Sequence, residues 1–258
     1  MKSTLLVVGD RFVAPRMPEN VIGFSAFVAN LREDRSNEIV GERHIYIGQG
    51  INPAEERALR SEVLNSAFSQ QIVLHDGDSE KVARSQVHKH QEENILIAGL
   101  EPIGEHEFSA KLKVDGDNEL VLDHTSGWHI SGMVILEAMR QMAMAVTERY
   151  YADYANEGGG RGFAIQSWDT KFESFLFPLD STLTCKTEVT GTYGKRVSFR
   201  AELSVLQCGR VSARAAIEYT VMDGEVMSSI EARRAREVVR QLAKGSSLVE
   251  TEQLATAV

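Results

Sequence analysis

Cysteine and proline are scarce in this chain. Its 258 residues include two cysteines, Cys185 and Cys208, and five prolines. Two cysteines exclude a disulfide-stabilised scaffold and offer no metal-ligand spacing. This usage suits a reducing compartment, so we expect a cytoplasmic protein without a bound metal.

Long hydrophobic runs are also missing. The most apolar stretch, 130–146, is interrupted by Glu137, Arg140 and Gln141. It therefore falls short of the roughly 18 uninterrupted apolar residues that indicate a membrane helix. The apolar run before Gly9 is too short for a secretory signal. We expect neither membrane insertion nor export.

The chain has fewer basic than acidic residues. The chain has 28 Lys and Arg against 37 Asp and Glu, which gives a net charge of −9. This excess of negative charge disfavours general attraction to nucleic acid or to an anionic membrane, so we expect no partner of either kind. With 43% hydrophobic and 25% charged residues, the composition is that of a soluble globular protein with a buried core.

Residues 1–80 predict a small α/β domain. Short apolar runs typical of buried strands occur at 5–8, 44–47 and 72–74. Helical spacing of apolar residues occurs over 21–31, and Asn52-Pro53 supplies a cap and a first-turn proline for a helix through about Phe68. The β-α-β-α-β order favours a short parallel sheet with helices over both faces.

The pattern changes after a polar linker at 76–84. Strand patterns occur at 95–99, 108–114, 163–172, 183–192, 196–207 and 211–222. One long helix, predicted over 130–151, is apolar on nearly every side, as expected of a helix enclosed by a sheet. This predicts an α+β chain with a hotdog fold over 85–225, an antiparallel sheet wrapped around one central helix. Residues 229–258 predict an amphipathic helix and a frayed tail.

The polar exceptions in the central helix are candidates for chemistry. Glu137, Arg140 and Gln141 stand at i, i+3 and i+4 and therefore share one face. Burying a charge among apolar residues costs several kcal/mol unless the charge is paired. Two interpretations stay open: a structural ion pair between Glu137 and Arg140, or a carboxylate tuned by burial that faces a ligand.

The loop before that helix, 123–133, also concentrates polar groups. Asp123, His124 and His129 lie in it, and Gly132 allows close backbone approach where the helix begins. Free N–H groups at a helix N-terminus suit a carbonyl or a phosphate. His124 and His129 could act as general acids or bases, or could instead cap the loop.

Residues 123–144, DHTSGWHISGMVILEAMRQMAM, resemble the A-factor biosynthesis hotdog family, the γ-butyrolactone synthases of bacterial signalling. That family carries an Asp-His element, a second His, a Gly-Met pair, Leu-Glu-Ala and Arg-Gln. Residues 87–98, VHKHQEENILIA, are similar to the segment that opens its domain, and residues 172–180 fit it as well. A looser similarity, through Gly132 and Glu137, links the chain to the β-hydroxyacyl-ACP dehydratases.

The resemblance implies transfer of a β-ketoacyl group from acyl carrier protein to the hydroxyl of dihydroxyacetone phosphate. No cofactor is implied beyond the phosphopantetheine of the carrier protein or of CoA. Glu137 would act as base or orient the hydroxyl, and Arg140 would bind phosphate or keep Glu137 ionised. Backbone N–H groups of Gly132 and Met133 would stabilise the thioester oxyanion. Further expected substrate-binding residues are Asp123, Gln141, His88 and Lys89.

The expected partners follow from this implied reaction. They are an acyl carrier protein or CoA thioester and a small phosphorylated acceptor. Synthases of the family contain two hotdog repeats, whereas this chain has room for one, so we expect a homodimer. An acidic carrier protein needs a basic landing surface, and the last helix carries Arg233, Arg234, Arg236, Arg240 and Lys244. A merely solvated helix face explains the same residues.

Alternative functions stay open at this point. A hotdog dehydratase or thioesterase would use His124 or His129 with Glu137. A non-catalytic acyl- or lactone-binding protein would present an apolar tunnel with Glu137 anchoring the ligand. Gly9-Asp10 and Gly48-Gln49-Gly50 follow strands, where α/β sheets bind ligands, but match no nucleotide fingerprint. We expect the N-terminal part to pack beside the hotdog sheet or to assist dimerisation.

Overall fold

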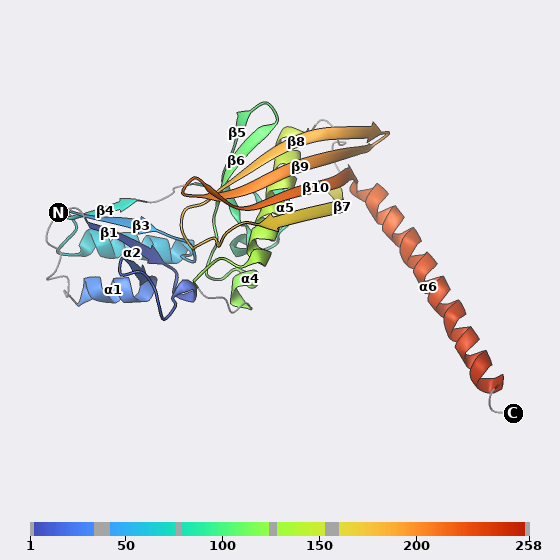
Figure 1. The fold of residues 1–258 in the computed structure, drawn as a ribbon, viewed down its shortest axis with the longest axis horizontal. Coiled ribbons are helices and arrows are strands. Elements are labelled where there is room, and N and C mark those ends of the chain that lie inside the picture. The colour runs from blue at the N-terminus through green and yellow to red at the C-terminus, as the bar shows by residue number, and fades with distance from the viewer. Residues whose placement is uncertain (1–2, 34–41, 76–78, 124–127, 153–159, 256–258) are drawn as a thin grey trace.

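The computed structural model describes residues 3–33, 42–75, 79–123, 128–152 and 160–255, with side chains described up to Lys244. Figure 1 shows a small parallel sheet with two helices, a larger antiparallel sheet around a central helix, and a terminal helix that extends away from both. No helix in the described part of the chain is long and apolar enough to cross a membrane.

The N-terminal sheet has four parallel strands in the order β2-β1-β3-β4. Its elements are β1 (Ser3–Val8), β2 (Val21–Gly23), α1 (Phe24–Arg32), β3 (Arg43–Ile47), α2 (Pro53–Asn65) and β4 (Ile72–His75), with the 3-10 turn η1 (Asp10–Phe12). The helix predicted from Val21 begins instead at Phe24, because residues 21–23 pair with β1 as an edge strand. Asn52 caps α2 as predicted, in a reciprocal capping box with Glu55.

The expectation of helices over both faces of this sheet is wrong. Helices α1 and α2 pack against each other on one face. Both crossovers advance in the same direction across the sheet, β2 to β3 and β3 to β4, so right-handed connections place both helices on the same side. The opposite face contributes Leu6 and Val8 to the core of the larger sheet.

The larger sheet has six antiparallel strands in the order β5-β6-β8-β9-β10-β7. Its strands are β5 (Ile97–Gly104), β6 (Glu107–Leu112), β7 (Arg161–Phe172), β8 (Thr182–Tyr193), β9 (Arg196–Gln207) and β10 (Arg210–Asp223). The central helix is α5 (Gly132–Tyr150), and short turns α3 (Arg84–Val87), η2 (Glu92–Asn94) and α4 (Glu119–Leu122) precede it. This is the predicted hotdog fold.

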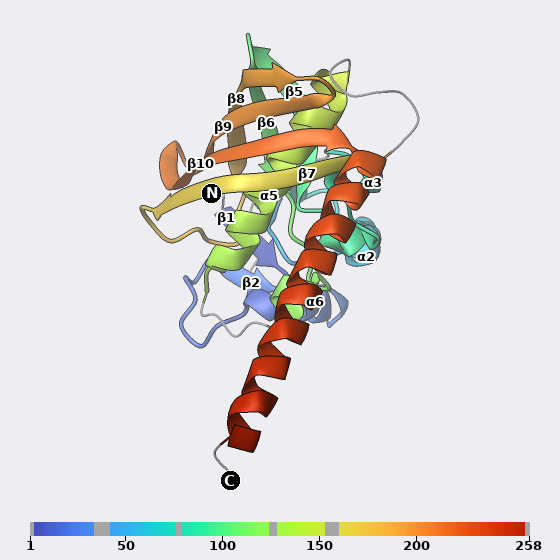
Figure 2. The same ribbon diagram turned by 90° about the vertical axis from the view of Figure 1, so that its right-hand side faces the viewer.

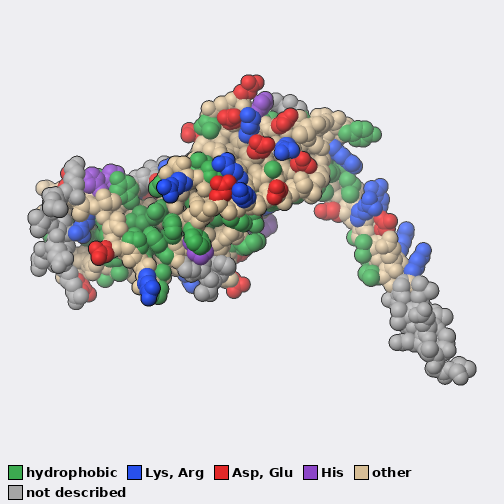
Figure 3. Space-filling model, in the orientation of Figure 1, with side chains coloured by type: hydrophobic (Ala, Val, Ile, Leu, Met, Phe, Trp, Pro, Cys, Tyr) green, Lys and Arg blue, Asp and Glu red, His purple; other side chains and the backbone are tan. Residues whose placement is uncertain are grey.

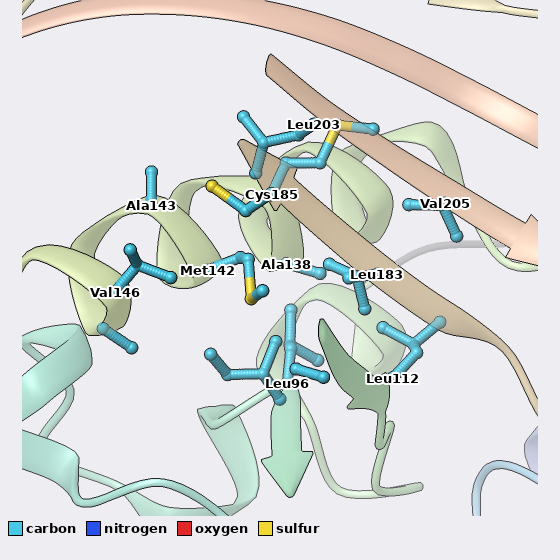
Figure 4. Close-up of a cluster of buried hydrophobic side chains, with 14 of the residues drawn as sticks. Leu96, Leu112, Ala138, Met142, Ala143, Val146, Leu183, Cys185, Leu203 and Val205 are labelled. Carbon is cyan, nitrogen blue, oxygen red and sulfur yellow. The ribbon is translucent and has the colours of Figure 1, made fainter. Parts of the chain in front are cut away.

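Side chains from α5 and the inner face of the sheet fill the core. Figure 4 shows Met142 and Val146 of α5 among the inward side chains of β8 and β9, with Leu96 below. Alternation along the strands turns Leu183, Cys185, Leu203 and Val205 inward and leaves the charged residues outside. Burial raises the pKa of Cys185 to about 12, so this thiol stays protonated within the packing.

The two sheets meet at the carboxyl ends of β1 and β3. The Gln49 amide donates to the Leu112 carbonyl at 3.0 Å and accepts from the Val114 N–H at 2.6 Å. The Gly50 N–H donates to the Val114 carbonyl at 2.7 Å. A Cβ on Gly9 would lie 1.9 Å from the Gly50 carbonyl oxygen, so only glycine fits there. Loops of the hotdog sheet therefore fill the crevice that binds ligands in open α/β sheets.

The terminal helix α6 (Gly224–Ala255) follows directly from β10 and begins five residues earlier than the predicted Ser229. Figures 1 and 2 show it leaving the hotdog sheet beside β7. At its base, the Met227 side chain lies against Gly162 of β7. Farther along, Val238, Val239 and Leu242 are exposed, and Figure 3 shows several basic side chains along this helix.

Candidate functional site

Glu137, in the second turn of α5, is the centre of a polar cluster. Arg140 binds its carboxylate with two hydrogen bonds, Nε to Oε2 and Nη2 to Oε1, each 2.8 Å long. The Lys89 ammonium lies 2.9 Å from Oε1, and the Gln141 amide donates to Oε1 at 3.0 Å. One carboxylate thus holds two cations from separate elements.

This environment keeps Glu137 ionised. Burial alone raises the pKa of a carboxyl group, but the hydrogen bonds and charge of Arg140, aided by Gln141 and Lys89, outweigh it. Together these interactions lower the pKa of Glu137 to about 2. A carboxylate with so low a pKa, and with both oxygens already hydrogen-bonded, is a poor proton acceptor at neutral pH. Its geometry suits the orientation of Arg140 and Lys89.

Gln141 positions this cluster from within the core. It is completely buried, and its oxygen accepts from the Leu96 N–H at 2.8 Å. Its nitrogen donates to the Asn94 carbonyl at 2.8 Å as well as to Glu137. Because it is fully buried and both atoms of its amide are hydrogen-bonded, Gln141 supports Glu137 and the segment that leads into β5.

The segment 87–89 runs along the same face of α5. The Val87 carbonyl accepts from Arg140 Nη2 at 3.4 Å, and Lys89 pairs with Glu137. Between them, His88 Nε2 lies 3.8 Å from Glu148 Oε1. His88 and Lys89, two residues expected to bind substrate, are therefore brought to the helix face that carries Glu137 and Arg140.

A small hollow of about 60 Å³ adjoins this cluster. Its lining is apolar except for two residues and comprises Arg140, Ala143, Met144, Phe163, Ile165, Ile217 and Tyr219. The Arg140 guanidinium is paired with Glu137. Because the Arg140 side chain is still 27% exposed, a ligand can reach it. A cationic group beside an apolar recess suits a ligand with an anionic group and a hydrocarbon part.

A larger hollow of about 530 Å³ lies elsewhere, on strands of the hotdog sheet. Its polar lining includes Thr184, Lys186, Glu202, Ser204 and Arg214, whose side chains face away from α5. None of the predicted site residues lines it. We therefore place the candidate site at the smaller hollow.

Among the other predicted residues, Gly132 and Met133 lie at the N-terminal end of α5, and His129 precedes it by three residues. Ser131 caps α5, Gly132 begins it with Phe172 packed close by, and Met133 is exposed. His129 lies beside the Phe175 ring at 5.0 Å between centroids. At 1.5 Å rise per residue, Gly132 and Arg140 are about 12 Å apart along the helix axis. Asp123 is the exposed C-cap of α4, and His124 lies outside the described residues.

Sequence reasoning missed three residues near the hollow: Glu148, Arg161 and Phe163. Glu148 lies two turns beyond Arg140 on the same face of α5, so helical spacing could have identified it. The Arg161 guanidinium pairs with Glu148 at 2.6 Å, and Phe163 meets the His88 ring edge-on. Both come from β7, and no spacing in the sequence brings a strand to a particular helix residue.

Comparison with known proteins gives a family and several structural neighbours. The model of the A-factor biosynthesis hotdog domain family, AfsA, matches residues 70–223, more than half of the chain. None of the curated proteins matches. Among solved structures, the dehydratase heterocomplex ApeI:P from Xenorhabdus doucetiae is 14% identical with a TM-score of 0.40, over 55% of this chain and 91% of that one.

Two thioesterases are also among the similar solved structures. A mutant thioesterase from Pseudomonas aeruginosa is 14% identical with a TM-score of 0.38, over 55% of this chain and 95% of that one. A probable thioesterase from Bartonella henselae is 20% identical with a TM-score of 0.31, over 46% and 91%. At such values these neighbours carry no argument about activity.

Proposed function

This chain belongs to the A-factor biosynthesis hotdog domain family, and from that premise we propose that it is an acyl-thioester enzyme. It transfers a β-ketoacyl group from a carrier thioester to the hydroxyl of a small phosphorylated acceptor, as in the making of butyrolactone signals. The acyl group arrives on the phosphopantetheine of acyl carrier protein or CoA.

The observation that carries this proposal is the pair of oriented cations beside an apolar recess. Lys89 and Arg140 converge on Glu137, and Arg140 borders the hollow. Phosphate binds best to cations held in fixed geometry, since less side-chain entropy is lost on binding. The apolar lining suits an acyl chain. Together they fit a phosphorylated acceptor and an acyl donor better than water or a lone hydrocarbon ligand.

The proposed reaction converts the acyl thioester into an ester of the acceptor. The acceptor oxygen bonds to the thioester carbonyl carbon, the carbon–sulfur bond breaks, and the hydroxyl proton ends on the departing sulfur. The N–H groups at the start of α5 support the proposed oxyanion position near Gly132. This end lies about 12 Å from Arg140 along the axis, so the two ends of α5 would contact different parts of the substrates.

We also propose that two copies associate along β7, an edge strand of the hotdog sheet. Residues of β7, Phe163 and Ile165, line the hollow, and Ile165 is 47% exposed. A second copy seated there would add walls to a recess that is small and open in one chain. This arrangement supplies the second hotdog unit by symmetry.

The test is product analysis by mass spectrometry. Purified protein is incubated with β-ketoacyl carrier protein, with and without dihydroxyacetone phosphate. We expect acyl loss only with the acceptor, together with a new phosphate ester. Release of free acid would identify a thioesterase, and loss of water from a β-hydroxyacyl control would identify a dehydratase. No change with any substrate would favour a binding protein and overturn the proposal.

A further inference from the structure

Helix α6 packs on the hotdog sheet at its base and is exposed beyond it. The Met227 side chain lies against Gly162 of β7, whereas every side chain over 231–244 is exposed. Figures 1 and 2 show the helix extending away from the sheet and past the β7 edge. Because an amphipathic helix gains most of its stability from packing its apolar face, this stretch is expected to have a partner.

The exposed stretch is amphipathic. Four apolar residues recur at i, i+3, i+4 and i+7, which places them on one side of the helix, and basic residues occupy the opposite side. The apolar side, here called the α6 stripe, comprises Ala235, Val238, Val239 and Leu242, and the basic side comprises Arg233, Arg236, Arg240 and Lys244. Val238, Val239 and Leu242 are each more than half exposed. In the described part of one chain, this apolar surface therefore stays open to solvent.

A second exposed apolar surface lies at the far end of β7. Met133, Phe172 and Phe175 are each more than half exposed, and we call them the α5 patch. They lie together, because a Cβ on Gly132, the neighbour of Met133, would be 3.2 Å from the Phe172 ring, and Phe175 follows three residues later. Phe175 in turn lies beside His129, which precedes α5. The patch therefore borders the N-terminal end of α5.

Charge complements this apolar match. Figure 1 shows α4 beside the N-terminal end of α5, and α4 and its C-cap carry the exposed acidic residues Glu119 and Asp123. Residues 224–244 hold five Lys and Arg against three Glu, in a chain whose net charge is −9. A basic helix is therefore attracted to the acidic border of the patch.

Pairing along β7 brings the stripe of one copy to the patch of another. The base of α6 contacts Gly162 at the start of β7, and the patch includes Phe172 at its end. These positions lie about 33 Å apart along one strand. In a two-fold antiparallel pair, however, the start of one strand lies beside the end of the other. A second copy therefore presents its patch where α6 begins.

We propose that α6 is an exchanged arm whose stripe packs on the α5 patch of a second copy. The inference rests on the proposed function, which pairs two copies along β7. Each arm presents a face roughly 30 Å long and 10 Å wide, so two arms and the surfaces they cover bury about 1,200 Å². This area reaches the lower limit of stable interfaces before the paired strands are included.

The exchanged arm gives the second copy a part in the reaction. The patch borders Gly132, where the proposed oxyanion position lies, so the arm of one copy covers the acyl site of the other. The basic side of the arm then faces outward, where an acidic carrier protein can approach it. A carrier protein bound to the arm therefore delivers its acyl group to the site of the other copy.

Cross-linking tests this contact without an assay of activity. Two chains are co-expressed in a Cys208→Ser background, one with Phe175→Cys and the other with Leu242→Cys; Cys185 is buried and stays. A short bis-maleimide should join the two chains, and should join few pairs when either chain is expressed alone. The control replaces Leu242→Cys with Arg236→Cys, on the opposite side of α6, and should give much less product.

Sedimentation velocity measures what the contact contributes. Leu242→Asp and Phe175→Asp should each raise the dimer dissociation constant by about 10-fold or more, because each places an unpaired charge in an apolar contact. The double variant should lose less than both effects multiplied, since both act on one contact. Arg236→Gln should match the wild type.

The results distinguish the arm from the proposed reaction. A dimer without the mixed cross-link, or with its dissociation constant unchanged in both variants, would overturn the arm alone. A monomeric wild type would overturn the β7 association and the arm with it. A cross-linked dimer that forms no ester would overturn the proposed reaction and leave the arm in place.

Discussion

Lys89 Nζ lies 2.9 Å from Glu137 Oε1, which ties the segment before the hotdog sheet to its central helix. The same carboxylate binds Arg140 through both oxygens. Glu137 is therefore the anchor of two cations, one from each side of the site. A structural ion pair and a ligand-facing group were two interpretations of Glu137 and Arg140, and the geometry is compatible with both at once.

Glu137→Gln should make stability less dependent on pH. The pKa of Glu137 falls on folding from its ordinary 4.5 to about 2, so its contribution is complete above pH 4.5 and is lost as pH falls towards 2. A shift of this size corresponds to roughly 3 kcal/mol. Urea unfolding between pH 2 and 7 should show wild-type stability dropping more steeply than that of the variant. Parallel profiles would contradict the ion-paired anchor; exposed Glu202→Gln is the control.

Gln141→Met should destabilise the protein without introducing a charge. Methionine is similar in shape, but it leaves the Leu96 N–H and the Asn94 carbonyl without their hydrogen-bond partner. It also removes one hydrogen-bond donor to Glu137. Two buried backbone groups without partners cost about 2–6 kcal/mol together. Chemical denaturation measures the change, and Gln91→Met, at an exposed position, should be nearly neutral. Equal stability of the two variants would mean that the Gln141 network contributes little.

Ile165→Asp should dissociate the proposed dimer. A carboxylate at this position would place unpaired charge between two apolar β7 surfaces. Ile103→Asp is a matched control, because Ile103 is exposed on β5 at the opposite edge of the same sheet. Sedimentation velocity should show a dimer for the wild type and the control and a monomer for Ile165→Asp. A monomeric wild type would refute association along β7.

Reversing charge on α6 should weaken use of a carrier-bound substrate. Arg233, Arg236 and Arg240 share one side of this helix, whose base packs on Gly162 beside the hollow. Replacing all three with Glu should raise KM for acyl carrier protein by about 10-fold or more, since carrier proteins are acidic. The KM for an acyl-pantetheine should stay the same. An unchanged KM for acyl carrier protein in the triple variant would indicate a merely solvated helix face.

The hotdog fold could be predicted because its strongest signal is local. A helix apolar on nearly all sides needs a sheet around it, and six strand patterns flank it in order. The parallel sheet was harder, since β2 is only three residues long and Val21 continues the apolar spacing of α1. Whether two helices share a face depends on strand order, which no residue pattern in 1–80 encodes.

The candidate site was predictable in its helical part only. Glu137, Arg140 and Gln141 share a face by spacing alone. That Gln141 faces the core, and that Lys89 reaches Glu137, depends on how 87–96 packs on α5. Arg161 comes from the far edge strand, so its contact with Glu148 is a property of the fold. Long-range pairs of this kind leave no trace in the spacing of one sequence.

The most direct test of the central claim is whether Arg140 recognises the acceptor's phosphate. Ester formation is measured with dihydroxyacetone phosphate and with dihydroxyacetone, for the wild type, Arg140→Gln and the exposed control Arg210→Gln. A charge-assisted contact predicts that the wild type and the control prefer the phosphorylated acceptor by about 10- to 100-fold in kcat/KM. Arg140→Gln should lose most of that preference. An unchanged preference in Arg140→Gln would contradict the account, because the cation pair would then have no part in binding the acceptor.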